Sequence, residues 1–211
     1  MKPQASQVFE TLFNRHPALE DCRGDILAAA EVLLDSWSAG GKLLICGNGG
    51  SAADSVHIVG ELLKAFAIPR PLPADAAQAI RTRAGDYAAD RLQGALPALS
   101  LAAELGLTTA FANDVAPDLV FAQQVYGLGR TGDALLAIST SGNSANVMHA
   151  VQVADALGIR TIGLTGALGG KLATVANVVI RVPETEVYKI QELHLPVYHA
   201  LCLAAEQEFF G

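Results

Sequence analysis

The sequence predicts an α/β protein in which helices cover both faces of a parallel sheet. Short apolar runs alternate with helix-forming runs along the chain, and this alternation is typical of parallel sheets. One pattern occurs twice, at 43–53 and at 135–146: an apolar run, a small polar loop and a helix-forming run. Ligands of such proteins bind at the carboxyl ends of the strands, so these two loops are the first candidates for a functional site.

Two helices are expected before the first strand. Helical periodicity runs from about Gln4 to His16 and from about Cys22 to Ser38, and Gly40-Gly41 ends the second helix. We expect this pair, within residues 1–40, to pack outside the sheet or against a partner subunit.

The first strand and its helix precede an irregular segment. The strand is expected at Lys42–Cys46, and Ser51 is the expected N-cap of a helix that runs to about Phe66. Residues 68–95 then interrupt the alternation, because Pro69, Pro71 and Pro73 exclude a continuous helix at the start and a polar, Ala-rich stretch follows. We expect its larger part, 72–95, to be an insertion or a mobile lid.

The remaining elements return to the alternation of strands and helices. The expected strands are 96–101, 133–138, 160–165 and 177–182. The expected helices are 102–105, 117–128, 144–157 and the long 187–209, with a loop at Asn113-Asp114 and one helical turn after Gly169-Gly170.

The composition favours an oligomeric protein that binds its ligand locally. Hydrophobic residues make up 51% of the 211 residues and charged residues only 17%, so we expect part of the surface to be buried between subunits. The net charge of −7 argues against nucleic-acid binding through a basic face. No charged leader with an apolar core opens the chain, and no apolar run reaches ~18 residues, so we expect a cytoplasmic protein without a membrane partner. Cys22, Cys46 and Cys202 are expected to be buried free thiols.

Both repeated loops offer groups that bind an anion. In the first, the glycines at 47, 49 and 50 permit close backbone approach, but the loop is neither a Rossmann fingerprint nor a Walker A motif. An ordinary tight turn therefore stays open as its explanation. In the second loop four hydroxyls lie within six residues, on Ser139, Thr140, Ser141 and Ser144. Hydroxyls and N–H groups at a helix start satisfy phosphate oxygens, so a phosphorylated small molecule is the expected ligand.

Two helices carry titratable residues. His57 and Glu61 lie four residues apart on the helix after the first loop and share one face, which suits a metal site, an acid–base pair or a solvated helix face. The final helix offers Gln191, His194 and His199 in an apolar segment, and His194 is expected to be a hydrogen-bonded core residue.

Several motifs carry a family resemblance. They are Cys46–Ser51, Asn113-Asp114, Ser139–Ser144, Leu164–Gly166 with Gly169-Gly170, and Ile190–Glu192. At these motifs the chain resembles the sugar isomerase (SIS) family, and within it the phosphoheptose isomerases. The resemblance breaks at about residues 72–95 and otherwise runs from the N-terminal helices to the end, which implies a single SIS domain over 1–211.

The resemblance implies a fold, an activity and an assembly. The fold would be a flavodoxin-like parallel sheet flanked by helices, and the protein a homotetramer with active sites built from more than one subunit. The activity would be aldose–ketose isomerisation of sedoheptulose 7-phosphate to D-glycero-D-manno-heptose 7-phosphate, the first step toward heptose for bacterial surface glycans. The cofactor would be a divalent metal, commonly zinc.

Carried over by position, the resemblance also assigns residues. The implied metal ligands are His57, Glu61, Gln191 and His199, and Glu61 and His199 are the implied catalytic pair. The implied substrate-binding residues are Asn48, Gly49, Gly50, Ser51, Asn113, Asp114, Ser139, Thr140, Ser141, Ser144 and Gln191.

The implied metal site meets a geometric difficulty. Gln191 and His199 are eight residues apart, about 12 Å along an ideal helix, so one straight helix cannot easily offer both to one ion. Either Pro196 breaks or kinks the helix, or one ligand comes from another subunit.

The chemistry of isomerisation suggests roles for two of these residues. Glu61 would move a proton between C1 and C2 through an enediol, and His199 would handle the oxygen protons. The metal would orient the substrate and stabilise the enediolate.

Two other functions remain open. The replication-initiator-associating adaptor of bacteria shares the fold and the Ser-rich loop but lacks the catalytic carboxylate and the late histidine, both present here as Glu61 and His199. An isomerase or sensor for another sugar phosphate also fits, because every sugar phosphate offers the same phosphate group to the loop. Gly60, where many phosphoheptose isomerases carry a second acidic residue, and the 72–95 segment are the departures from the family pattern.

Overall fold

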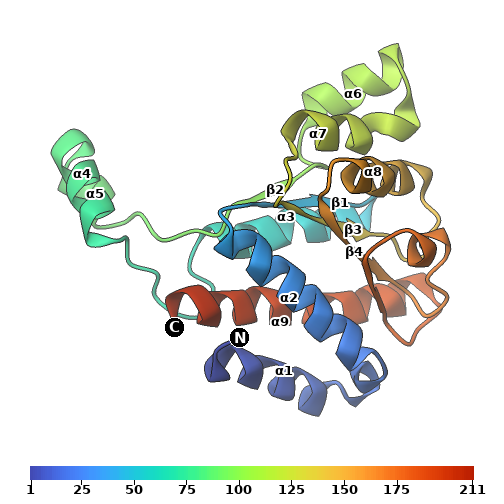
Figure 1. Ribbon diagram of the computed structural model, residues 1–211, viewed down its shortest axis with the longest axis horizontal. Coiled ribbons are helices and arrows are strands. Elements are labelled where there is room, and N and C mark those ends of the chain that lie inside the picture. The colour runs from blue at the N-terminus through green and yellow to red at the C-terminus, as the bar shows by residue number, and fades with distance from the viewer.

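A five-stranded parallel sheet forms the centre of the protein. The computed structural model describes all residues, Met1–Gly211, and the strand order is β2-β1-β3-β4-β5 (Figure 1). The strands are β1 (Leu43–Cys46), β2 (Ala98–Ser100), β3 (Ala134–Ile138), β4 (Arg160–Thr165) and β5 (Val178–Arg181). This is the flavodoxin-like order, so the expected fold class is confirmed.

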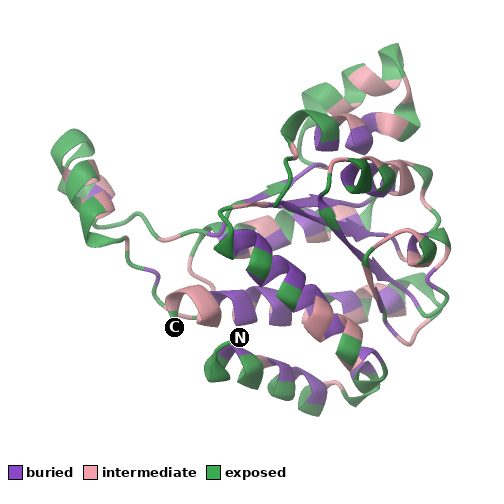
Figure 2. Cartoon of the chain, viewed as in Figure 1, coloured by how far each residue is buried: buried purple, intermediate pink, exposed green.

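Helices cover both faces of the sheet, as Figure 2 shows by the buried colour of the strands between them. One face carries the helices α1 (Pro3–Arg15), α2 (Arg23–Ser38), α3 (Gly50–Leu63) and α9 (Val187–Phe210). The other carries α6 (Leu105–Asp114), α7 (Val120–Leu128) and α8 (Ala145–Ala156). Alternate side chains of one strand enter the two cores, with Leu43 and Ile45 on the first face and Leu44 and Cys46 on the second. Both faces are therefore apolar, which explains the continuous hydrophobic runs of the strands.

Helices α3 and α9 pack side by side and run in the same direction. At their N-terminal ends, a Cβ added to Gly50 would lie 2.5 Å from Nε2 of Gln191. Two turns further along, the ring of His57 lies 5.1 Å from the ring of His199. This parallel pair sets the position of every titratable residue in the candidate site.

The order of elements agrees with the sequence, and the N-terminal helical pair packs in the first core. Short 3₁₀ turns occur at Pro17–Cys22, Pro117–Leu119 and Lys171–Thr174, the last being the turn expected after Gly169-Gly170. All three cysteines are free and buried, as expected. No helix combines the length and apolarity needed to cross a bilayer.

Three local predictions were wrong. The N-cap of α3 is Gly49, not Ser51, because the turn needs a φ of +56° that suits glycine. The helix ends at Leu63 rather than near Phe66, since Lys64 is extended. The helix expected at 102–105 is instead α6, which ends at Asp114, so Asn113-Asp114 is not a loop. Phe111 packs on the second core, and this contact keeps the chain helical through that region.

Pro196 does not break α9, which continues through it as one helix. A proline inside a helix removes one backbone hydrogen bond to the carbonyl four residues earlier, here that of Glu192. Glu192 and Pro196 both line an open groove of about 400 Å³ between α1 and α9 rather than the packed core. A break at Pro196 is therefore wrong as the way in which Gln191 and His199 could share an ion, while a ligand from another copy stays a prediction.

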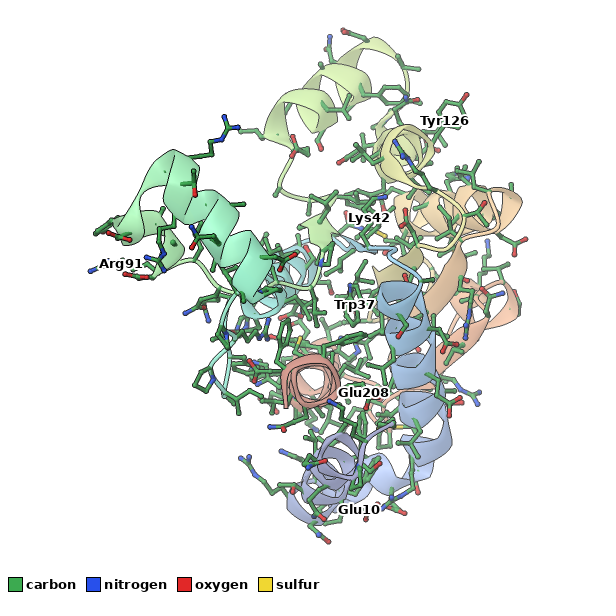
Figure 3. The ribbon with its side chains drawn as sticks, turned by 60° about the vertical axis from the view of Figure 1, so that its left-hand side comes forward. Glu10, Trp37, Lys42, Arg91, Tyr126 and Glu208 are labelled. Atoms are coloured by element: carbon green, nitrogen blue, oxygen red, sulfur yellow. The ribbon has the colours of Figure 1, made fainter.

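The segment 72–95 forms an arm that stands away from the sheet. It contains α4 (Ala74–Ala84) and α5 (Asp86–Ala89), and no residue of α4 is buried. Arg81 ties the two helices together through Asp86 and Asp90, 2.8 Å from Asp90. Figures 1 and 3 show the arm, marked by Arg91 in Figure 3, projecting from the body of the protein. The arm does not lie over either repeated loop, and its role as a lid stays a prediction.

Candidate active site

The two repeated loops meet at the carboxyl edge of the sheet. Asn48 of the first loop and Asn146 in the first turn of α8 form a reciprocal amide pair, with both N–O distances 2.9 Å. The backbone of the first loop turns tightly, so that a Cβ on Gly47 would lie 2.8 Å from Cβ of Ser51. The first loop is therefore a compact turn whose asparagine faces the second loop.

The second loop has the features of an anion site. It lies at the start of α8, with Ser144 as N-cap, and the hydroxyls of Ser139 and Ser144 are 3.1 Å apart. The backbone N–H groups of Thr140, Ser141 and Ser144 have no acceptor within the chain. Free amides and hydroxyls at a helix N-terminus are the groups that bind phosphate.

Close backbone packing fixes the shape of this loop. A Cβ on Gly142, whose φ is +64°, would lie 1.9 Å from the carbonyl oxygen of Gly169. A cavity of about 200 Å³ opens beside Thr140 and Ser141 and extends toward Ile190 of α9. The expected phosphate loop is thus held rigidly next to a small hollow.

A second group of polar residues lies further along the α3–α9 pair. Nε2 of His57 is 3.2 Å from Oε1 of Glu61, and Nζ of Lys64 is 2.9 Å from Oε2 of the same carboxylate. The ring of His199 stands edge-to-face against the ring of His57. We call His57, Glu61, Tyr198 and His199 the mid-helix cluster.

Electrostatics in the mid-helix cluster favour a carboxylate beside a neutral imidazole. Burial raises the pKa of Glu61, but the hydrogen bonds from Lys64 and His57 outweigh it, so the pKa lies below its usual value. Burial and the nearby His57 lower the pKa of His199, against an opposing effect of Glu61. Glu61 is therefore an ionised acceptor and His199 a neutral ring near pH 7.

The other predicted residues lie apart from this cluster. Gln191 lies at Gly50, and Glu61 is about 16 Å of helical rise from Gly50 along α3. Asn113 and Asp114 are exposed at the end of α6, where the Asn113 amide donates to the Asp114 carboxylate at 2.8 Å. Within one chain the structure thus joins His57, Glu61 and His199, but it does not join them to Gln191 or to the loops.

The residues fit a divalent metal by chemistry, although a single chain does not form a finished site. Two imidazoles and a carboxylate are donors that zinc prefers. Nε2 of His199 is buried and has no hydrogen-bond partner, so it needs one. No group of three His, Cys, Asp or Glu side chains converges to hold an ion within the chain. The metal and its ligands therefore stay a prediction.

The sequence analysis missed Tyr198 of the mid-helix cluster and three residues that support the cluster, Asp54, Arg70 and Glu206. Tyr198 and Asp54 hydrogen-bond beside His57. Arg70 and Glu206 form a fully buried ion pair of 2.7 Å at the end of α3. Arg70 donates to the carbonyls of Leu62 and Glu61, while Glu206 accepts the backbone N–H groups that follow α3. A buried Arg or Glu gives no local signal, although the spacing of Asp54 and His57 on one helix face does.

Comparison with known proteins decides the family. The SIS domain family matches residues 14–91 and 74–166, so its two matches meet within the arm. The chain belongs to the SIS domain family. It is 38% identical over 194 residues to a phosphoheptose isomerase of Akkermansia muciniphila, covering 92% of this chain and 90% of the relative. It is 43% identical over 184 residues to that of Rhodospirillum rubrum, covering 87% and 86%. The solved structure of phosphoheptose isomerase GmhA from Neisseria gonorrhoeae superposes with a TM-score of 0.75 at 34% identity, over 96% of each chain.

Proposed function

We propose that this chain is a phosphoheptose isomerase that interconverts sedoheptulose 7-phosphate and D-glycero-D-manno-heptose 7-phosphate. The observation that carries the proposal is the ionised Glu61 carboxylate held beside a neutral His199, in a protein whose second loop offers free amides and hydroxyls. The similarity to named phosphoheptose isomerases selects the substrate among the sugar phosphates.

The two catalytic residues divide the proton transfers. Glu61 removes a proton from C1 of the ketose and returns it to C2, through an enediol. His199, kept neutral by burial, moves the proton between the O1 and O2 positions. Lys64 and His57 hold the Glu61 carboxylate by its two oxygens, so one carboxylate face stays fixed relative to the sugar.

The second loop binds the phosphate and leaves the sugar carbons free to react. Free N–H groups at 140, 141 and 144 and the serine hydroxyls would take the phosphate oxygens. Asn48, fixed by its pair with Asn146, would contact sugar hydroxyls beside the second loop.

A divalent metal, which we propose to be zinc, completes the chemistry. His57, Glu61 and His199 would hold it, and Gln191 would join from another copy of the chain. When bound, such an ion polarises the sugar carbonyl and stabilises negative charge on the oxygen. The orphaned Nε2 of His199 supports this assignment.

We propose that the site is completed between copies, in a homotetramer. The first loop, which meets the second through the Asn48–Asn146 pair, lies at the N-terminal end of α3, whereas Glu61 is about 16 Å of helical rise further along, so one chain cannot easily present loops and carboxylate to one sugar. The unbroken α9 separates Gln191 from His199 by about 12 Å, which points the same way. A second copy would bring the two halves together.

The test is an NMR assay with sedoheptulose 7-phosphate on metal-stripped protein, with and without added zinc. The proposal predicts a heptose 7-phosphate that forms only after zinc is restored. Turnover of a different sugar phosphate, or binding without turnover, would instead favour the sensor or the adaptor function. Equal product formation with and without added zinc would contradict a role for zinc.

A further inference from the structure

Helix α3 ends at Leu63, two residues after Glu61, and the carbonyls left over at that end have partners from outside the helix. Nη2 of Arg70 donates to the carbonyl of Glu61 at 3.1 Å, and Nη1 donates to that of Leu62 at 2.8 Å. The backbone N–H of Leu96 also donates to the carbonyl of Leu62, at 3.0 Å. The helix dipole favours a positive charge at this end. Arg70 thus caps the turn that carries Glu61.

The backbone N–H groups that would have continued α3 are bound by side chains as well. The N–H of Ala65 donates to Oε1 of Gln93 at 2.8 Å, and the N–H of Phe66 donates to Oε1 of Glu206 at 2.7 Å. In a longer helix these two N–H groups would have bonded to the carbonyls that Arg70 holds. The end of α3 is therefore set by the side chains of Arg70, Gln93 and Glu206.

The same side chains join α3 to the helix that carries His199. Nε of Arg70 lies 2.7 Å from Oε1 of Glu206, and both side chains are fully buried. Glu206 lies seven residues, about two turns, after His199 on α9. The guanidinium group also lies over the ring of Phe210, 4.9 Å from its centre. Because breaking a buried, hydrogen-bonded ion pair is costly, this contact fixes one helix against the other.

The base of the arm takes part in this connection. Arg70 lies just before the arm, and its carbonyl accepts the N–H of Gly94 at 2.8 Å. A Cβ added to Gly94 would lie 2.6 Å from Cε1 of Phe210, so the arm returns in close contact with α9. Figure 1 shows the arm leaving the body beside the C-terminal end of α9. The arm, α9 and the end of α3 therefore meet just beyond Glu61.

We propose that Arg70 is a positioning residue that holds the Glu61 carboxylate in place beside His57 and His199. The last turn of a helix frays when its end groups have no partners, and Glu61 lies in that turn. A displacement of about 1 Å at a reacting group lowers turnover by about 10²-fold. Arg70, supported by Glu206, prevents that displacement. The consequence for turnover rests on the proposed function, whereas the position of Glu61 does not.

Two variants test this role, each with a matched control. Arg70→Lys keeps the positive charge but replaces the guanidinium fork by one ammonium group, which cannot serve Glu206 and both carbonyls with the same geometry. Gln93→Ala removes only an exposed acceptor, and it decides the test if Arg70→Lys does not fold. The controls are Arg23→Lys, whose guanidinium pairs with two surface carboxylates, and Gln78→Ala on the exposed α4.

Kinetics of the zinc-loaded protein with sedoheptulose 7-phosphate distinguish positioning from folding. Circular dichroism measures the folded fraction, and turnover is expressed per folded molecule. We expect kcat to fall about 10- to 100-fold in Arg70→Lys and by a smaller factor in Gln93→Ala, with KM unchanged and no effect in the controls. A cap that only stabilised the fold would leave kcat per folded molecule unchanged. That result, or a rise in KM without a fall in kcat, would overturn the inference.

Crystal structures separate this inference from the proposed function. In Arg70→Lys, or in Gln93→Ala if that variant alone folds, we expect the Glu61 carboxylate to move about 1 Å or more relative to the rings of His57 and His199. If the carboxylate moves but the unchanged protein never turns over sedoheptulose 7-phosphate, the proposed function fails and the positioning role stands. A carboxylate that keeps its place in the folded variants would overturn the positioning role.

Discussion

The loop end of the α3–α9 pair and its mid-helix cluster differ in chemistry and in how they are built. The loop end consists of amides, hydroxyls and glycines, and its geometry comes from tight turns next to the sheet. The mid-helix cluster consists of titratable side chains from two helices, joined by hydrogen bonds between residues up to 144 positions apart. The first region is suited to holding a phosphate, and the second to moving protons.

The separation of the two regions explains why neither is sufficient. A loop of hydroxyls binds many phosphates, and a His–Glu pair on a helix does nothing by itself. The proposed mechanism requires both regions to reach one substrate, and within one chain they lie far apart along the helices.

The largest effect is expected from a change in the mid-helix cluster, which we propose to transfer the protons. Glu61→Gln keeps the shape of the side chain but removes the base, so we expect kcat to fall by about 10²- to 10⁴-fold with little change in KM. Steady-state kinetics of the zinc-loaded protein measure it, with Glu31→Gln on the exposed face of α2 as control. Near-normal turnover in Glu61→Gln would remove Glu61 from the mechanism.

The next largest effect is expected on the free energy of unfolding, at the buried ion pair that supports the mid-helix cluster. Arg70→Met leaves Glu206 buried without its charge partner, and we expect a loss of about 3–5 kcal/mol in the free energy of unfolding. Arg81→Met in the exposed arm should leave the unfolding free energy close to that of the unchanged protein. Urea unfolding measures both, and similar losses in the two variants would contradict the contrast between body and arm.

A smaller effect is expected at the loop end. Ser141→Ala removes one hydroxyl from the phosphate site, so we expect KM to rise about tenfold or more while kcat changes little, as a lost hydrogen bond to a charged group predicts. Thr131→Ala, which alters a hydroxyl bonded to Leu157 at the opposite edge of the sheet, is the control. If kcat fell instead of KM rising, the loop would contact the reacting carbons rather than the phosphate.

The last and most gradual effect, spread over more than two pH units, is a pH dependence of stability. Burial lowers the pKa of His194 from 6.5 to about 4, so between these values the unfolded chain binds more protons than the folded one. The free energy of unfolding should therefore fall as the pH drops through this window, by at most about 1.4 kcal/mol per pH unit. Unfolding curves of His194→Gln should lose this slope, and those of the partly exposed His149→Gln should keep it. An unchanged slope in His194→Gln would assign the pH dependence to other groups.

The sequence predicts the loop end better than the mid-helix cluster. Local patterns such as Ser139–Ser144 carry their own geometry, because hydroxyls, glycines and a helix start lie next to each other in the chain. The strands and most helices are predicted for the same reason. Where a turn depended on one backbone angle, as at Gly49, or on a distant packing contact, as at Phe111, the local pattern misplaced the element boundary.

The mid-helix cluster depends on the register of two helices. His57 and Glu61 are visible as a pair four residues apart, but nothing local indicates that Tyr198 and His199 lie beside them. His194 was expected to be hydrogen-bonded, yet both ring nitrogens are buried without a side-chain partner, which only the packed structure reveals. Asn113 and Asp114 are exposed at the end of α6 rather than in a loop, and their contact with substrate stays a prediction.

The most direct test of the account is complementation between two inactive variants. Glu61→Gln is produced together with a loop variant carrying Ser141→Ala and Ser144→Ala, and mixed assemblies are isolated through two different tags. If each site takes its loop from one copy and Glu61 from another, the mixed assemblies should regain about a quarter of the unchanged activity, because random pairing rebuilds one site in four. Mixed assemblies with no more activity than the two separate variants would show that one chain holds the whole site, and would contradict the account.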